Sequence, residues 1–227
     1  MNRPYTTLFM LMSVDGKIST GPTDQFDFDR DLPRIRGVKE GLPQYYALER
    51  KTDLVSLNTG RVMAKIGINT RIGEPIRRPL TFIILDNKPH LTSRGVSYLA
   101  RSLKRLILVT ANAHHPALKS SEPNVSVIRH DHHGLKKIFK ILKTKFRINR
   151  ITVQSGGTLN AVLFKEKLID DVSIVVAPIV VGGQGTPTLA DGEHLVNQRN
   201  LGDAPVMRLK SMRKLRHGYL HLRYGVV

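Results

Sequence analysis

The chain of 227 residues contains no cysteine. This absence excludes a disulfide framework, a metal site built from thiolates and a cysteine nucleophile, and it fits a reducing compartment. No apolar run approaches the length of a membrane-spanning helix, and the apolar stretch at residues 7–12 is too short for the core of a signal peptide. We therefore expect a cytoplasmic protein without a membrane segment.

Acidic residues are scarce: 18 Asp and Glu stand against 36 Lys and Arg, which gives a net charge of +18. Residues 61–150 carry +15 of this charge, whereas residues 1–60 are neutral overall and residues 151–227 carry +3. Such an excess raises nucleic acid as a partner. No aromatic stacking motif or known nucleic-acid-binding pattern accompanies it, however. We expect anionic small molecules rather than nucleic acid to bind.

Many of the basic residues fall between residues 134 and 150, where apolar residues recur at helical spacing. This spacing predicts an amphipathic helix from about Gly134. The lysines then form the face opposite the apolar stripe, which is typical of a solvated surface.

Two groups of histidines, His114–His115 and those within residues 130–133, contain possible metal ligands. Both groups lie in polar, loop-like sequence, and neither has the i, i+4 spacing of a helical zinc motif. We interpret them as exposed histidines and predict no metal site.

The rest of the chain alternates apolar strand-like runs with helical patterns, which predicts an α/β fold. Strands separated by helices favour a mostly parallel sheet covered on both faces, and the last two strands favour an antiparallel edge hairpin. The predicted strands are residues 5–12, 54–57, 80–85, 106–110, 125–128, 151–154, 172–176, 206–212 and 219–224. Further helices are predicted at residues 44–51 and 159–167. Because there is no repeat or linker, we expect a single domain over residues 1–227.

A pair of glycines, Gly156 and Gly157, stands between a predicted strand and a predicted helix. Glycine there lets the backbone approach a ligand closely, and the first N–H groups of the helix are free to bind a phosphate. Many strand-to-helix turns need glycine only for their backbone angles, so the pair alone leaves both interpretations open.

Several segments, in the right order, resemble the reductase domain of riboflavin biosynthesis, which has the dihydrofolate-reductase-like fold. Residues 11–18 resemble its opening "MSLDGKIA", and residues 177–183 resemble its "AP-x-x-x-GG" segment. Residues 154–172 resemble its "GG-x-L…L-x-D-E" helix and strand, and residues 58–62 are similar to its cofactor turn. The resemblance implies the three-layer architecture of this superfamily.

The resemblance also implies NADPH as cofactor. Gly156 and Gly157 would hold its pyrophosphate at the N-terminus of the following helix. Thr59, Gly60 and Arg61 would form an opposing turn, with Arg61 a candidate for the 2′-phosphate and a plain surface arginine as the alternative. The expected cofactor-binding residues are Thr59, Gly60, Arg61, Ser155, Gly156, Gly157, Thr158 and Leu159.

On the substrate side, the resemblance implies that Asp15 and Lys17 line the pocket and are the candidate catalytic residues. A lysine can donate to a carbonyl oxygen and an aspartate can accept from a ring N–H, although a plain Asp-Gly turn is the alternative. Arg71, Arg77 and Arg78 are candidates for a substrate phosphate. The implied reaction is hydride transfer from NADPH to C1′ of an opened ribosylamino sugar.

Two departures from the family keep other functions open. Ser155 stands where the family commonly has a glutamate, and residues 64–71 replace its "ADDP-x-L-T-x-R" stretch. The alternatives are a reductase of a different pterin, pyrimidine or carbonyl compound, a non-catalytic nucleotide-binding module, or a basic nucleic-acid-binding protein. The resemblance further implies a homodimer, and the length is expected to leave no room for the deaminase domain that often precedes this reductase.

Overall fold

The computed structural model describes residues 2–130, 134–193, 202 and 204–227. The chain forms two compact units. Unit 1 consists of Met1–Pro4 and Asp53–Ser155, and unit 2 consists of Tyr5–Thr52 and Gly156–Val227. The expectation of a single domain stays a prediction.

Unit 1 contains five parallel strands in the order β5-β4-β3-β2-β6. They are β2 (Val55–Thr59), β3 (Arg78–Leu85), β4 (Leu103–Thr110), β5 (Val125–Arg129) and β6 (Arg150–Val153). Because all five strands run in the same direction, their carboxyl ends meet at one edge of the sheet, which we call the carboxyl edge. The loops at this edge connect each strand to the helix or turn that follows it.

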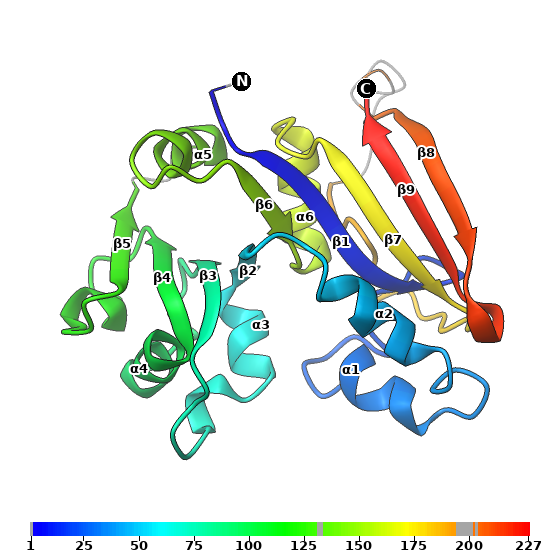
Figure 1. Cartoon of the computed structure of the whole chain (residues 1–227), viewed down its shortest axis with the longest axis horizontal. Helices are drawn as coiled ribbons and strands as arrows, with labels where there is room; N and C mark the ends of the chain where they lie inside the picture. The colour runs from blue at the N-terminus through cyan, green and yellow to red at the C-terminus, as the bar shows by residue number, and fades with distance from the viewer. Residues whose placement is uncertain (1, 131–133, 194–201, 203) are drawn as a thin grey trace. The chain divides into compact units, whose positions relative to one another are not determined.

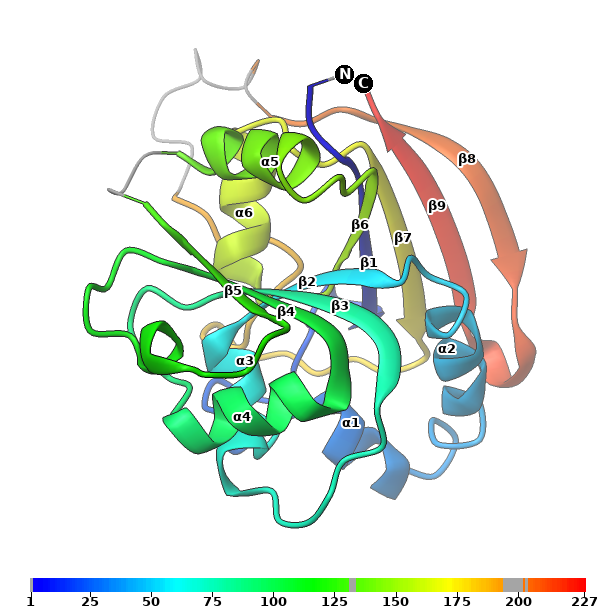
Figure 2. The same ribbon diagram turned by 60° about the vertical axis from the view of Figure 1, so that its left-hand side comes forward.

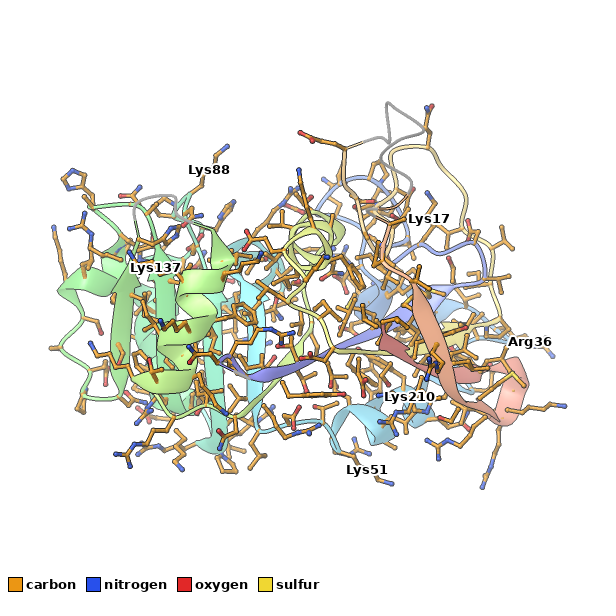
Figure 3. All side chains as sticks on the ribbon, turned by 90° about the horizontal axis from the view of Figure 1, so that it is seen from above. Lys17, Arg36, Lys51, Lys88, Lys137 and Lys210 are labelled. Carbon is orange, nitrogen blue, oxygen red and sulfur yellow. The ribbon has the colours of Figure 1, made fainter. Side chains whose placement is uncertain are left out.

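Three helices cover the two faces of the unit 1 sheet: α3 (Gly60–Lys65), α4 (Ser93–Ser102) and α5 (Leu135–Thr144). Figures 1 and 2 show α3 and α4 on one side and α5 on the other. Side chains of α3 and α4 form one core with alternate residues of β3 and β4, among them Ile84 and Leu108. The predicted helix at 134 is confirmed, since Ile138, Phe139 and Leu142 of α5 are buried. Lys136, Lys137 (Figure 3) and Lys140 are exposed, whereas Lys143 is half-buried.

Helix α4 was not among the predicted helices. Three serines and a glycine within Ser93–Ser102 weaken its helical propensity. Its buried residues Val96, Leu99 and Ala100 nevertheless follow the i, i+3, i+4 spacing of a helical face. Thr92 caps the helix, because its hydroxyl accepts a hydrogen bond from the Gly95 N–H at 3.2 Å.

Unit 2 contains four strands in the order β1-β7-β9-β8: β1 (Tyr5–Ser13), β7 (Asp171–Ala177), β8 (Met207–Lys214) and β9 (Leu220–Val226). Strands β1 and β7 are parallel, whereas β9 pairs antiparallel with both β7 and β8. The antiparallel C-terminal hairpin was predicted and is confirmed. The α/β class with mostly parallel strands is confirmed as well.

The helices of unit 2 are α1 (Phe28–Asp31), α2 (Leu42–Glu49) and α6 (Gly157–Lys165). Figures 1 and 2 place α2 and α6 on opposite sides of β1 and β7. Phe9, Leu11 and Tyr219 pack with α1 and α2 in a single buried core. Within the described residues, no helix combines the length and the apolar character needed to span a bilayer.

Candidate functional site

The turn that follows β1 in unit 2 is organised by Ser13, whose side chain is buried. The Ser13 hydroxyl donates to Oδ1 of Asp15 at 2.5 Å and accepts from the Lys17 N–H at 2.9 Å. Gly16 has a φ of +78°, which glycine adopts without strain. The Asp-Gly-Lys segment is therefore a fixed turn.

Asp15 connects this turn to the loop that follows β7. Its carboxylate accepts hydrogen bonds from the Val181 N–H at 3.1 Å and the Gly182 N–H at 2.7 Å. The hydrogen bond from Ser13, followed by that from Gly182, lowers the pKa of Asp15 to about 2. Asp15 is therefore ionised at neutral pH, where it can accept hydrogen bonds but cannot supply a proton.

Lys17 lies beside the same loop. Its Nζ donates to the Thr186 carbonyl oxygen at 3.1 Å, and its backbone forms a β-bridge with Thr188. One backbone carbonyl uses one of the three donors of an ammonium group. The structure thus brings Asp15 and Lys17 together in one turn, as the sequence predicted, with donor capacity left on the lysine.

The two glycines at the start of α6 have different surroundings. A Cβ at Gly157 would lie 2.2 Å from Oδ2 of Asp191 and 2.4 Å from the Thr188 carbonyl oxygen, so the fold itself requires glycine there. A Cβ at Gly156, the N-cap of α6, would meet nothing within 4 Å. Gly156 has an ordinary φ of −73° and receives no side-chain cap. The packing of the chain does not explain this glycine, whereas the approach of a ligand to the helix N-terminus would.

The other predicted cofactor residues near α6 have distinct environments. Ser155 and Leu159 are buried, whereas Thr158 is exposed in the first turn of the helix. Asn160, which was not predicted, is completely buried and donates from Nδ2 to the Leu189 carbonyl oxygen at 2.8 Å. This bond joins the start of α6 to residues 188–191.

In unit 1, Thr59, Gly60 and Arg61 form the turn between β2 and α3 at the carboxyl edge. The Thr59 hydroxyl accepts from the Val62 N–H at 3.3 Å and caps α3. Gly60 is buried, and Arg61 is exposed in the first turn. Arg61 therefore lies in the first turn of α3 at the surface, which fits both the phosphate-binding and the plain surface interpretation.

The three arginines suggested for a substrate phosphate do not gather around this turn. Arg78 is the first residue of β3, so it lies at the edge of the sheet opposite to Thr59, roughly 20 Å away at 3.3 Å per residue. Arg77 precedes it. Arg71 instead stacks over the ring of Tyr98 on α4, with 5.9 Å between the guanidinium carbon and the ring centre.

The expectation that the histidines are exposed is wrong for His115. Its side chain is completely buried, and its Nε2 lies 3.0 Å from Oδ2 of Asp86. The sequence showed only a polar loop here, because the buried acceptor is 29 residues away. His114 is exposed as expected.

The remaining histidine group falls largely outside the described residues, since Asp131, His132 and His133 are not described. Among the residues that are, no three or more His, Asp or Glu side chains could together hold a metal ion. The expected lack of a metal site stays a prediction.

Comparison with known families identifies the chain. The family model described as the RibD C-terminal domain matches residues 4–221. The chain belongs to the RibD C-terminal domain family. The resemblance found in the sequence is thereby confirmed.

The chain is similar to proteins that carry the name 2,5-diamino-6-ribosylamino-4(3H)-pyrimidinone 5′-phosphate reductase. The protein of Archaeoglobus fulgidus is 27% identical over 208 residues, which cover 86% of this chain and 90% of the relative. That of Saccharomyces cerevisiae is 24% identical over 195 residues, or 81% of this chain and 75% of the relative.

Solved structures show the same fold. RibD of Acinetobacter baumannii matches all of this chain with a TM-score of 0.68 and 16% identity. The chain spans only 59% of that protein. The riboflavin biosynthesis reductase Rib7 of S. cerevisiae matches with a TM-score of 0.63 and 18% identity, over all of this chain and 91% of Rib7.

Proposed function

We propose that this protein is an NADPH-dependent reductase that acts on a ribosylaminopyrimidine 5′-phosphate in riboflavin biosynthesis. Gly156 carries the proposal, because it is an uncapped glycine at a helix N-terminus whose missing side chain the fold does not explain. Membership of the RibD C-terminal domain family and the names of the relatives support it.

The residues around Gly156 fit a nicotinamide nucleotide. The first N–H groups of the nine-residue helix α6 would bind the pyrophosphate, aided by the helix dipole. The exposed hydroxyl of Thr158 adds a donor in the same turn. In unit 1, Thr59, Gly60 and Arg61 are proposed as the second cofactor-binding turn, with Arg61 for the 2′-phosphate. The bound cofactor supplies the hydride.

Asp15 and Lys17 are proposed to hold the substrate. Because Asp15 is ionised and already accepts two backbone N–H groups, its role is to fix the turn and to accept from the pyrimidine ring. Lys17 would donate to a pyrimidine carbonyl oxygen. Neither residue needs to supply a proton for binding, so their contribution is orientation of the reacting carbon.

The proposed substrate is the compound named in the relatives, 2,5-diamino-6-ribosylamino-4(3H)-pyrimidinone 5′-phosphate. Opening of its ribose gives a C1′=N bond. Hydride adds to C1′ and a proton adds to the nitrogen, which yields the ribitylamino product. Arg71, Arg77 and Arg78 remain candidates for binding the 5′-phosphate, and this proposal rests on the family resemblance alone.

A homodimer is proposed from the C-terminal hairpin. All eight residues of β8 are exposed, and Leu209 and Met212 are 52% and 65% exposed on the face that they share with Leu222 and Tyr224 of β9. An exposed edge strand can pair with another chain, and a large exposed apolar patch commonly marks an interaction surface. Sedimentation velocity should show a dimer that Met212→Glu dissociates. The control is Ile72→Glu, which changes an apolar residue of unit 1 that is 87% exposed. This variant should remain a dimer.

The first test is binding of NADPH and NADH to the purified protein by calorimetry. We expect micromolar binding of NADPH and weaker binding of NADH, followed by oxidation of NADPH when the pyrimidine substrate is added. Absence of binding by either nucleotide would refute the proposal.

The second test separates binding from turnover with Lys17→Met, which keeps the apolar stem and removes the ammonium group. Turnover should fall at least about tenfold, a loss of about 1.4 kcal/mol in transition-state stabilisation, while NADPH affinity is retained. Lys51→Met, at an exposed lysine of the same unit, is the matched control (Figure 3). Normal turnover in Lys17→Met would remove this residue from the site.

A further inference from the structure

A buried carboxylate lies directly behind the Thr59–Gly60 turn of unit 1. Asp86 follows the last residue of β3, and its side chain is completely buried. A carboxylate in a protein core is costly unless hydrogen-bond donors replace water. The N–H groups of His90 and Leu91 donate to it at 3.0–3.1 Å, and one ring nitrogen of each of His90 and His115 lies 2.9–3.0 Å away. Burial raises the pKa of Asp86, but these bonds, led by that of His115, outweigh burial and lower it.

The neighbouring contacts fix the protons on His115. The Ala117 N–H donates to Nδ1 of His115 at 3.1 Å, so that Nδ1 carries no proton. The ring proton must then lie on Nε2, where it is donated to Asp86. His115 is therefore a neutral donor dedicated to Asp86. His90, by contrast, is partly exposed.

Asp86 is in direct contact with Gly60. A Cβ at Gly60 would lie 2.1 Å from Cγ of Asp86 and 2.4 Å from each carboxylate oxygen. The Cα of Gly60 thus rests against the carboxylate. Since Gly60 is the first residue of α3 and Thr59 is its cap, the position of Asp86 sets the position of the turn.

Three segments of the carboxyl edge meet at this one group. The turn after β2 packs on it, the residues before α4 donate to it through His90 and Leu91, and the loop after β4 donates through His115. The Thr110 hydroxyl also donates to the Asp86 carbonyl oxygen at 2.8 Å. A network whose donors are all satisfied makes a rigid support.

We propose that Asp86 is a positioning residue for the cofactor, which acts through Gly60, and that His115 holds Asp86 in place. The inference rests on the proposed function, because it takes Thr59–Gly60–Arg61 as a cofactor-binding turn. Asp86 does not touch the ligand itself. Loss of the Asp86 carboxylate therefore weakens NADPH binding and leaves turnover at saturating NADPH nearly unchanged.

The test compares His115→Gln with His115→Leu. Both replacements remove the Nδ1 acceptor of Ala117, but only glutamine keeps an N–H donor for Asp86. We expect the Kd for NADPH to rise at least about tenfold in His115→Leu and to stay within about threefold of the wild type in His115→Gln. The value of kcat at saturating NADPH should change less than about threefold in both variants.

Asp86→Asn extends the test. Its amide NH2 group would face the donors of His90, Leu91 and His115, which need an acceptor. Its Kd for NADPH should rise as in His115→Leu. Asp53→Asn is the matched control, since Asp53 bonds to Arg150 and Thr152 at the opposite edge of the same sheet. It should lower the melting temperature and leave the Kd unchanged.

Equal NADPH affinity in His115→Leu, His115→Gln and wild type would overturn the inference, as would an equal loss in both variants. If Asp86→Asn does not fold, the His115 pair still decides. Failure of the wild type to bind NADPH would instead refute the proposed function, and this inference with it.

Discussion

Substitution of the two glycines at the start of α6 should have opposite consequences. At Gly157, a methyl group would lie within 2.4 Å of the Thr188 carbonyl oxygen, and the backbone cannot move aside cheaply. Overpacking of this kind costs about 1–3 kcal/mol. For a chain of this size, each kcal/mol lowers Tm by about 2–4 °C. Gly157→Ala should therefore lose about 2–12 °C in Tm.

At Gly156 the contributions to stability nearly cancel. Alanine is a poorer N-cap than glycine by roughly 0.5–1 kcal/mol. Replacing glycine also restricts the unfolded chain, which stabilises the folded state by about 0.4–1 kcal/mol. This gain applies because a φ of −73° suits any residue. Gly156→Ala and Gly156→Val should thus melt close to the wild type. A valine side chain would nevertheless occupy the space in front of the first helical N–H groups.

The assay pairs thermal unfolding with NADPH calorimetry. We expect Gly156→Val to keep its Tm and to lose NADPH affinity at least about tenfold, or about 1.4 kcal/mol. Gly157→Ala reports instead on folding. A Gly156→Val variant that binds NADPH as tightly as the wild type would refute a phosphate site at α6, and one that unfolds would refute the steric argument.

Three further predictions concern Asp15, Tyr219 and the exposed lysines of α5. The pKa of Asp15 is lowered to about 2, so its hydrogen bonds stabilise the fold above about pH 4. That contribution is lost as the pH falls toward 2. Between pH 6 and pH 2, the melting temperature of Asp15→Asn should therefore fall less than that of the wild type. Burial, with a smaller effect of Glu40, raises the pKa of Tyr219 to about 12, and its hydroxyl donates to the Val38 carbonyl oxygen at 2.7 Å. Tyr219→Phe should lose about 1–2 kcal/mol in urea unfolding at pH 8, and the loss should shrink as the pH rises from 10 toward 12. Replacement of Lys136, Lys137 and Lys140 by Gln should leave NADPH affinity unchanged, because these residues lie on the exposed face of α5; a large decrease would show that this face takes part in binding.

The strand pattern was predictable because buried parallel strands are continuous apolar runs with turn residues between them. Strands such as β3, with Ile83 and Ile84 buried, needed no tertiary information. Helix α4 was not predicted because it has few apolar residues at helical spacing and because its glycine and serines have low helical propensity. The ends of the predicted elements shifted by one to three residues, because turns and caps, such as Thr59 at the end of β2, depend on local hydrogen bonds.

The site was predictable only as far as it is local in the sequence. Asp15, Gly16 and Lys17 form a turn whose chemistry can be read from adjacent residues. The pairing of Gly157 with Thr188 and Asp191, and that of Gly60 with Asp86, joins residues 26 or more positions apart. Periodicity carries no information about such contacts. Consequently, the different reasons for the two glycines at 156 and 157 could not be separated before the structure.

The division of the chain has a consequence for its synthesis. Strand β1 is made first, but its partner β7 lies 164 residues later in the sequence, as the pairing of Thr7 with Asp171 shows. At roughly 5–20 residues per second, a ribosome needs about 8–33 s to reach that partner. Nearly all of unit 1 is a continuous stretch that emerges during this interval. All strands of unit 1 are therefore synthesised before β7, whereas the β1–β7 ladder of unit 2 must wait for the last quarter of translation.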